Sequence, residues 1–211
     1  MPIRIIPSVL AADFGHLQAE VDSIEAHADG IQIDVMDGHF VPNLSLGAPV
    51  AKCIRTKLPL DIHLMVSNPA ERIAEFLAFG VAQVTFHAEA VEDSNSRKAL
   101  IKAIRNGGAS AGIAVNPATS LASIEDVLED IDLVLVMTIV PGFSGQAFLP
   151  ETLEKVRTLR TRFPELRIQV DGGINAETAR LAREAGATEL VAATSIFGSS
   201  DRASAISSLR S

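Results

Sequence analysis

The sequence is poor in cysteine and has no excess of basic residues. Among its 211 residues Cys53 is the only cysteine, which excludes an internal disulfide, and no Cys-plus-His spacing indicates a structural zinc site. Asp and Glu outnumber Lys and Arg by 26 to 18, so the formal net charge is −8. Binding nucleic acid requires a basic face that neutralises phosphates. We therefore expect no nucleic-acid partner and a reducing, cytoplasmic location.

The sequence also lacks the segments that direct a chain to a membrane. Its first residues show no charged leader, long apolar stretch or small-residue cleavage site, so we expect no signal peptide. The longest strongly apolar run, Leu133 to Val140, is too short to cross a bilayer. With 47% hydrophobic and 21% charged residues, the composition is that of a globular protein. We expect a soluble protein with no membrane partner.

Eight short apolar segments recur along the chain and predict eight strands. Several are continuous runs of Val, Ile and Leu, which is typical of parallel strands that are buried on both faces. Between them, apolar residues three or four apart predict helices. The expected strands are Ile3–Val9, Ile31–Met36, Leu60–Val66, Ala82–His87, Ala111–Val115, Leu133–Thr138, Arg167–Val170 and Glu189–Ala193.

Capping residues and prolines mark the expected helix ends. Asn175 precedes Glu177 in a position that caps a helix, and Gly80 and Gly186 lie where helices would end. Prolines at or near a first helical position predict three more helix starts, two of them with a capping Asn: Asn68-Pro69, Asn116-Pro117 and Leu149-Pro150.

The regular alternation of strands and helices predicts the fold. Eight units in 211 residues give about 26 residues per unit, near the lower limit for a (β/α)₈ TIM barrel. No Gly-x-Gly-x-x-Gly turn follows the first strand and no linker is visible, which disfavours a doubly wound sheet. We therefore predict an α/β protein whose residues 1–211 form a single (β/α)₈ barrel domain.

Polar residues gather where the strands end, and active sites of such barrels lie at those ends. They are Ser8, Gln32, Asp34, Asp37, Asp61, His63, His87, Glu89, Asn116, Thr138, Asp171, Thr194 and Ser195. Alternation along the strands places Asp34 and His63 on inward faces, where charged groups are costly unless they are paired or metal-bound. Asp34, His63 and Asp171 together predict a catalytic or metal site, although each alone could be a satisfied structural residue.

Methionines and glycines mark the surroundings of this site. Met36, Met65 and Met137 fall near strand ends, where they either fill core gaps or form an apolar ceiling that excludes water. The glycine-bearing segments 140–146 and 171–173, with 193–195, are either tight turns or a phosphate site in which backbone N–H groups point at the anion.

Longer blocks of this sequence resemble a known family, the ribulose-phosphate 3-epimerases. The resemblance covers essentially the whole chain, and the second and third blocks are highly specific when they occur in this order. The blocks that carry it are Pro7–Phe14, Ile33–Asn43, Asp61–Val66, Asn116–Thr119, Pro141–Gln146 and Val170–Ile174.

The resemblance implies interconversion of D-ribulose 5-phosphate and D-xylulose 5-phosphate through an enediolate. It makes Asp34 and Asp171 the acid and base on opposite faces of the substrate, and Ser8 and His63 residues that hold substrate oxygens. We also expect the three methionines to cover the substrate and the chain to form a homo-oligomer. Two alternatives stay open: an epimerase of another ketose phosphate such as a ketohexose 6-phosphate, and a non-catalytic barrel that binds a sugar phosphate.

The resemblance also implies a divalent cation, namely zinc, iron, manganese or cobalt, held by two aspartates and two histidines. Asp34, His63 and Asp171 match three of these ligands, but Gln32 stands where the family has the other histidine. A glutamine carbonyl is a harder donor and a poorer zinc ligand than imidazole. We therefore expect Gln32 or water to complete a weaker site.

The family's phosphate-binding and substrate-contacting positions complete the expected site. Ser144 and Ala193 replace usual glycines and add bulk where backbone approaches phosphate, and Val140 replaces a usual polar residue. The expected substrate-binding residues in these segments are Gly142, Phe143, Ser144, Gly145, Gly172, Gly173, Ala193 and Thr194.

Overall fold

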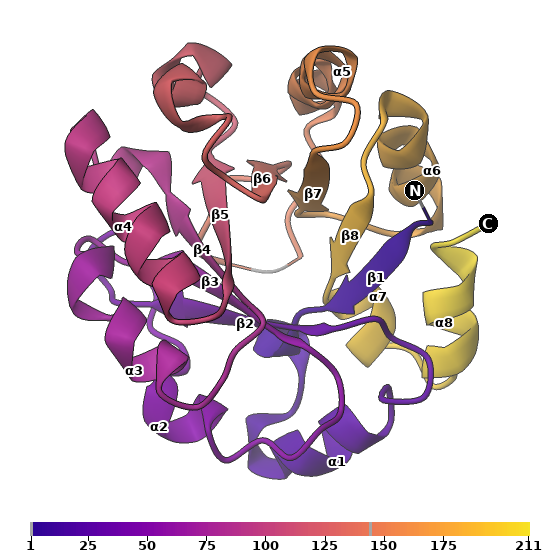
Figure 1. Ribbon diagram of the computed structural model, residues 1–211. Helices are drawn as coiled ribbons and strands as arrows, with labels where there is room; N and C mark the ends of the chain where they lie inside the picture. The colour runs from indigo at the N-terminus through magenta and orange to yellow at the C-terminus, as the bar shows by residue number, and fades with distance from the viewer. Residues whose placement is uncertain (1, 144) are drawn as a thin grey trace.

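Eight parallel strands curve into a barrel, and helices surround it (Figure 1). The computed structural model describes residues 2–143 and 145–211. Strand pairing follows the order β1-β8-β7-β6-β5-β4-β3-β2. The strands are β1 (Arg4–Pro7), β2 (Ile31–Met36), β3 (Leu60–Met65), β4 (Gln83–His87), β5 (Ser110–Val115), β6 (Leu133–Met137), β7 (Arg167–Asp171) and β8 (Glu189–Ala192).

The barrel closes where the first two strands meet. One isolated parallel bridge, between Ser8 and Gln32, joins the end of β1 to β2. The first strand is shorter than the expected Ile3–Val9 because the hydroxyl of Ser8 accepts a hydrogen bond from the N–H of Leu10 and starts a helical turn. The other strands lie at or within a few residues of their expected bounds, so the predicted (β/α)₈ fold is confirmed.

The helices lie outside the barrel, as Figure 1 shows. The α-helices are α1 (Leu17–Asp22), α2 (Ala48–Ala51), α3 (Ile73–Leu77), α4 (Ser94–Asn106), α5 (Leu153–Arg162), α6 (Ala176–Ala185), α7 (Thr194–Phe197) and α8 (Arg202–Ser208). The 3₁₀ turns are η1 (Val9–Ala11), η2 (Phe14–His16), η3 (Pro69–Glu71), η4 (Ala88–Ala90), η5 (Leu121–Val127) and η6 (Pro150–Thr152). Between β5 and β6 the connection is a 3₁₀ helix instead of the expected α-helix.

Some expected helix ends are confirmed and others are wrong. Asn175 caps α6 in a reciprocal capping box, and Gly186 ends that helix in the left-handed conformation. The expected start at Asn116-Pro117 is wrong because η5 begins later, where the hydroxyl of Ser120 caps it. Asn68 also fails to cap its turn, since its amide donates to the carboxylate of Glu71 instead.

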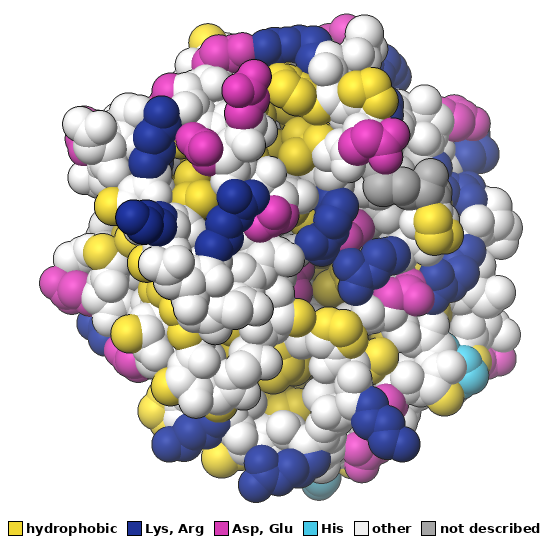
Figure 2. Space-filling view, viewed as in Figure 1, with side chains coloured by type: hydrophobic (Ala, Val, Ile, Leu, Met, Phe, Trp, Pro, Cys, Tyr) yellow, Lys and Arg dark blue, Asp and Glu magenta, His cyan; other side chains and the backbone are white. Residues whose placement is uncertain are grey.

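The strands are buried on both faces, as their continuous apolar runs predict. Val, Ile and Leu side chains pack between the barrel and its helices, while the barrel interior also holds charged groups. Glu189 is buried there and pairs with Arg4 at 2.9 Å and with Arg167 at 2.7 Å. On the face shown in Figure 2, Lys and Arg side chains lie among Asp and Glu side chains.

The two ends of the chain lie side by side (Figure 1). The guanidinium of Arg210 donates to the carbonyl of Ile3 at 3.0 Å and pairs with Asp29 at 2.7 Å, which ties the last helix to the first strand. None of the helices among the described residues combines the length and apolar character that crossing a bilayer requires.

Gly112 in β5 tests how tightly the barrel interior is packed. A Cβ at this position would collide with the hydroxyl of Thr85 on β4 and approach Leu133 of β6 to 3.1 Å. We expect Gly112→Ala to lower the free energy of unfolding by about 1–3 kcal/mol, measured by urea denaturation. As a control, Gly47→Ala places a Cβ 3.5 Å from Pro49 and should cost about 0.5 kcal/mol or less. Equal costs at both positions would contradict tight packing of the interior.

Candidate active site

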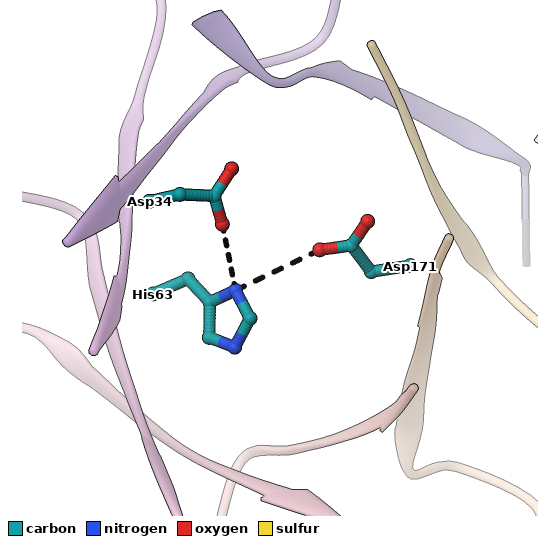
Figure 3. A group of neighbouring side chains, drawn as sticks. All are labelled: Asp34, His63 and Asp171. Carbon is teal, nitrogen blue, oxygen red and sulfur yellow. Dashed lines mark hydrogen bonds and ion pairs between the residues drawn. The ribbon is translucent and has the colours of Figure 1, made fainter. Parts of the chain in front are cut away.

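Asp34, His63 and Asp171 meet inside the barrel at the carboxyl ends of their strands (Figure 3). Nδ1 of His63 lies 2.8 Å from Oδ1 of Asp34 and 3.6 Å from Oδ2 of Asp171. Figure 3 shows Asp34 and Asp171 entering from two sides of the barrel, with both carboxylates directed at the same ring nitrogen. The structure thus brings together the three residues that the sequence predicts at the centre of the site.

Strand pairing fixes where these side chains point. Asp34 of β2 and His63 of β3 are partners in the parallel register, and Asp171 of β7 pairs with Met137 of β6. The hydroxyl of Ser8, just after β1, donates to Oδ2 of Asp34 at 2.5 Å. Four strands therefore position one cluster of buried polar side chains, and their hydrogen bonds and strand pairing restrict how these side chains can move.

Burial sets the charge of this cluster. Burial, together with the negative charge of Asp34, raises the pKa of Asp171 to about 8. Burial alone would lower the pKa of His63, but the hydrogen bond that His63 donates to Asp34 and the charges of both aspartates raise it overall. A cation at these oxygens would instead favour the ionised form of both carboxyl groups.

A cleft opens above the cluster, and nearly every expected substrate-binding residue lines it. None of the described residues that line it is Lys or Arg. The expected residues found there are Ser8, Asp34, Met36, Met65, Met137, Gly142, Phe143, Gly145, Asp171, Gly172, Gly173, Ala193 and Thr194. His63 and Gln32 are fully buried and are not among the lining residues, and Ser144 lies outside the described residues.

Two glycines bring the backbone close to the cleft. Gly172 and Gly173 have φ angles of 123° and 64°, in the region that favours glycine. A Cβ on Gly172 would approach the backbone N of Ile139 to 2.9 Å, and one on Gly173 would approach that of Phe148 to 2.8 Å. Side chains are thus excluded where the connection after β6 packs against the end of β7.

The three methionines form part of the cleft wall. Met36 and Met65 pack with Val41, while Met137 belongs to a separate cluster on β5 and β6 that includes Leu135. All three are buried, so they pack into the core, and they also line the cleft. Their role as an apolar cover that excludes water stays a prediction.

The sequence misses several residues of the site. Six further residues line the cleft without an expected substrate-binding role, although Ser195 and Pro141 lie in the glycine-bearing segments: Leu10, Ile139, Pro141, Ile174, Val191 and Ser195. His87 is a different omission, because its Nε2 lies 2.9 Å from Nε2 of His63. Its place at the end of the fourth strand was the available signal, but that position alone assigns no role.

Comparison with known proteins identifies the family. The ribulose-phosphate 3-epimerase family matches residues 4–197 of the sequence. The chain belongs to this family. It is 44% identical to the ribulose-phosphate 3-epimerase of Bacillus subtilis, over 99% of this chain and 98% of that protein. The ribulose-phosphate 3-epimerase of Methanocaldococcus jannaschii is 46% identical, over 99% and 90% of the two chains. The cytoplasmic isoform of ribulose-phosphate 3-epimerase from Oryza sativa is 44% identical, over 98% of this chain and 92% of that protein.

Solved structures of other enzymes share the fold of this epimerase-family chain. A 3-hexulose-6-phosphate synthase from Salmonella typhimurium superposes with a TM-score of 0.75 at 17% identity, over 99% of this chain and 97% of that one. A 3-keto-L-gulonate-6-phosphate decarboxylase from Vibrio cholerae also gives 0.75, at 13% identity and 100% and 96% coverage. At these identities the likeness shows the barrel alone.

The donor atoms of the epimerase-family site fit a divalent cation. One ligand atom each from Asp34, His63 and Asp171 lies within 4.8 Å of the others. Carboxylate and imidazole donors suit zinc and other first-row ions. Gln32 is fully buried, lies two residues before Asp34 on the inward face of β2, and has no hydrogen-bond partner for either amide atom among the described residues. An unpartnered amide oxygen here favours Gln32 as a further ligand.

Replacing Gln32 tests its part in the cation site. We expect Gln32→His to lower the dissociation constant for Zn²⁺ by at least about tenfold, since imidazole is the better zinc ligand and outer-shell changes already have effects of this size. Competition with a chromophoric chelator measures it. Gln18→His, on the surface, controls for an added histidine. This expectation would be wrong if the wild-type protein holds stoichiometric zinc through extended chelation and Gln32→His binds zinc no more tightly.

Proposed function

We propose that this chain interconverts D-ribulose 5-phosphate and D-xylulose 5-phosphate by inverting the configuration at C3. The observation that carries the proposal is the placement of Asp34 and Asp171, which extend from β2 and β7 into one site and reach the same nitrogen of His63 (Figure 3). Membership of the ribulose-phosphate 3-epimerase family supports the choice of substrate.

The two aspartates carry out the proton transfers. One carboxylate removes the proton on C3, which is acidified by the neighbouring C2 carbonyl, and negative charge develops on the oxygens of the enediolate. The other carboxyl group donates a proton to C3 from the opposite face. Inversion needs two groups because a single carboxylate on one face would return the proton to the side from which it came. In the reverse reaction, Asp34 and Asp171 exchange roles.

Local contacts support this division of roles. Asp34 accepts hydrogen bonds from the hydroxyl of Ser8 and from His63. In the cation-free site, burial and the charge of Asp34 raise the pKa of Asp171 to about 8, so this carboxyl group can hold a proton at neutral pH. Ser8 also lines the cleft, where its hydroxyl oxygen can accept a hydrogen bond from a substrate hydroxyl. Both ring nitrogens of His63 are engaged inside the barrel, so we place His63 at the cation and not in direct contact with substrate oxygens.

Asp34, His63 and Asp171 would hold a divalent cation, with Gln32 or water as a further ligand. We propose zinc, iron, manganese or cobalt, which accept this mixture of oxygen and nitrogen donors. When bound, such a cation stabilises the negative charge that develops on the substrate oxygens.

The remaining cleft residues bind the rest of the substrate. We place the phosphate at the glycine-lined end, where backbone N–H groups would hold it because no described Lys or Arg lines the cleft. The residues assigned to this end are Gly142, Phe143, Gly145, Gly172, Gly173, Ala193 and Thr194. Met36, Met65 and Met137 cover the reacting carbon and keep water from competing for the enediolate.

Isosteric replacement of each aspartate tests the proposal. We expect Asp34→Asn and Asp171→Asn each to lower epimerisation by at least about 10³-fold in both directions, because each turnover needs both a removal and a return. Coupled assays measure epimerisation, and NMR in D₂O measures exchange of the C3 proton, which one remaining carboxylate can still support. Asp130 is exposed, so Asp130→Asn controls for the loss of one carboxylate elsewhere and should leave epimerisation unchanged.

The same assay separates the pentulose from a longer substrate. D-ribulose 5-phosphate and a ketohexose 6-phosphate are compared side by side with the wild-type protein. Near-normal epimerisation by either aspartate variant would refute the two-carboxylate assignment, and preference for the hexulose would refute the choice of substrate.

A further inference from the structure

A second histidine faces His63 on the side away from the aspartates. Nε2 of His63 lies 2.9 Å from Nε2 of His87, and both rings are fully buried. The ring centroids are 5.1 Å apart. At this separation one nitrogen must carry a hydrogen and the other a lone pair, because two lone pairs or two N–H groups would repel each other.

The far side of His87 decides which nitrogen carries the hydrogen. Its Nδ1 lies 3.1 Å from Oε2 of Glu89. The other oxygen of Glu89 accepts hydrogen bonds from the N–H of Asn116, at 2.8 Å, and from the hydroxyl of Thr119. A carboxylate only accepts, so Nδ1 of His87 must donate to it. Nε2 of His87 then carries the lone pair, and Nε2 of His63 must donate.

Neighbouring contacts hold this chain of hydrogen bonds in place. The ring of Phe40 packs against that of His87 with centroids 4.8 Å apart. The ammonium of Lys155 on α5 donates to the carbonyls of Asn116 and Pro117, each at 2.8 Å, and so secures the loop that contacts Glu89. The arrangement is thus fixed from the strand ends and from a helix outside the barrel.

We propose that His87 and Glu89 are positioning residues that fix the tautomer and ring orientation of His63. A bound cation would take the place of the hydrogen that Nδ1 of His63 otherwise donates to Asp34 at 2.8 Å. With its remaining hydrogen held on Nε2, His63 then presents Nδ1 as the cation-binding atom beside Asp34 and Asp171. The inference rests on the proposed function, since it concerns the cation site of that reaction. Partners that hold the second nitrogen of a metal-binding histidine typically change metal affinity by about 10–100-fold.

Glu89→Gln tests the proposal because it reverses the donors and acceptors in the series of hydrogen bonds from Glu89 through His87 to His63. The N–H of Asn116 and the hydroxyl of Thr119 still need an acceptor, so the amide oxygen takes that place and the NH₂ group faces His87. Nε2 of His87 then carries the hydrogen and opposes the N–H of His63. We expect the dissociation constant for Zn²⁺ to rise by about 10–100-fold.

Nitrogen-15 NMR detects the change of tautomer and chelator competition detects the change of Zn²⁺ affinity. Nitrogen-15 NMR of the histidine rings, on protein loaded with Zn²⁺, should show wild-type His63 protonated on Nε2 and His87 on Nδ1. In Glu89→Gln, His87 should shift to the Nε2 form. Chelator competition gives the Zn²⁺ affinity of the same samples, and circular dichroism reports the fold.

Two further variants separate the carboxylate from packing. Glu89→Asp keeps a carboxylate and should keep the wild-type tautomers, with a smaller loss of affinity than Glu89→Gln. Asp13→Asn makes the same chemical change at an exposed pair, where Asp13 lies 2.8 Å from Nδ1 of His16, and should change nothing at the site. Equal losses in Glu89→Asp and Glu89→Gln would overturn the proposal.

The wild-type spectrum is a test that requires no variant to fold. His87 protonated on Nε2 in the wild-type protein, or a Zn²⁺ affinity of Glu89→Gln within about twofold of wild type, would overturn the positioning role. A protein with the expected tautomers and affinities that fails to interconvert the two pentulose phosphates would support that role and contradict the proposed function.

Discussion

Two carboxylates share the interior of this barrel, and one nitrogen of a histidine ring that contacts both of them makes that arrangement possible. Asp34 and Asp171 come from strands far apart in the sequence, and both approach Nδ1 of His63. Buried charges of one sign are costly unless a positive partner or a cation lies between them. The same constraint gives the site its chemistry, because it holds two acid–base groups apart on either side of one space.

Neighbouring residues hold Asp34, His63 and Asp171 in place and shape the cleft beside them. Ser8 joins the end of β1 to β2 and donates to Asp34, so the residue that closes the barrel also orients a carboxylate to which we assign a proton transfer. On the other side, His87 and Glu89 face the second nitrogen of His63. Gly172 and Gly173 allow the loops around the cleft to pack without side chains between them. Positions at the carboxyl ends of the strands therefore carry function, while their other faces pack the helices.

Much of this was predictable from local pattern. Continuous apolar runs indicate buried parallel strands, and strand alternation places Asp34 and His63 inside. The contact between His63 and His87 depends on how two neighbouring strands are staggered, which periodicity does not determine. Likewise, Asn116 and Ser120 are both good capping residues, and the sequence alone does not say that the hydroxyl of Ser120 caps the helix while Asn116 contacts Glu89. That the amide of Gln32 has no hydrogen-bond partner among the described residues also depends on the packing of several strands, which the sequence pattern does not determine.

The hydrogen at C3 provides the most direct test of the two-aspartate account. When D-ribulose 5-phosphate is converted in D₂O, NMR shows which hydrogen the product carries. Because the proton is removed by one carboxyl group and returned by the other, each molecule of D-xylulose 5-phosphate should carry a solvent deuterium at C3 from the first turnover. A product that keeps the C3 proton of the substrate would contradict the account.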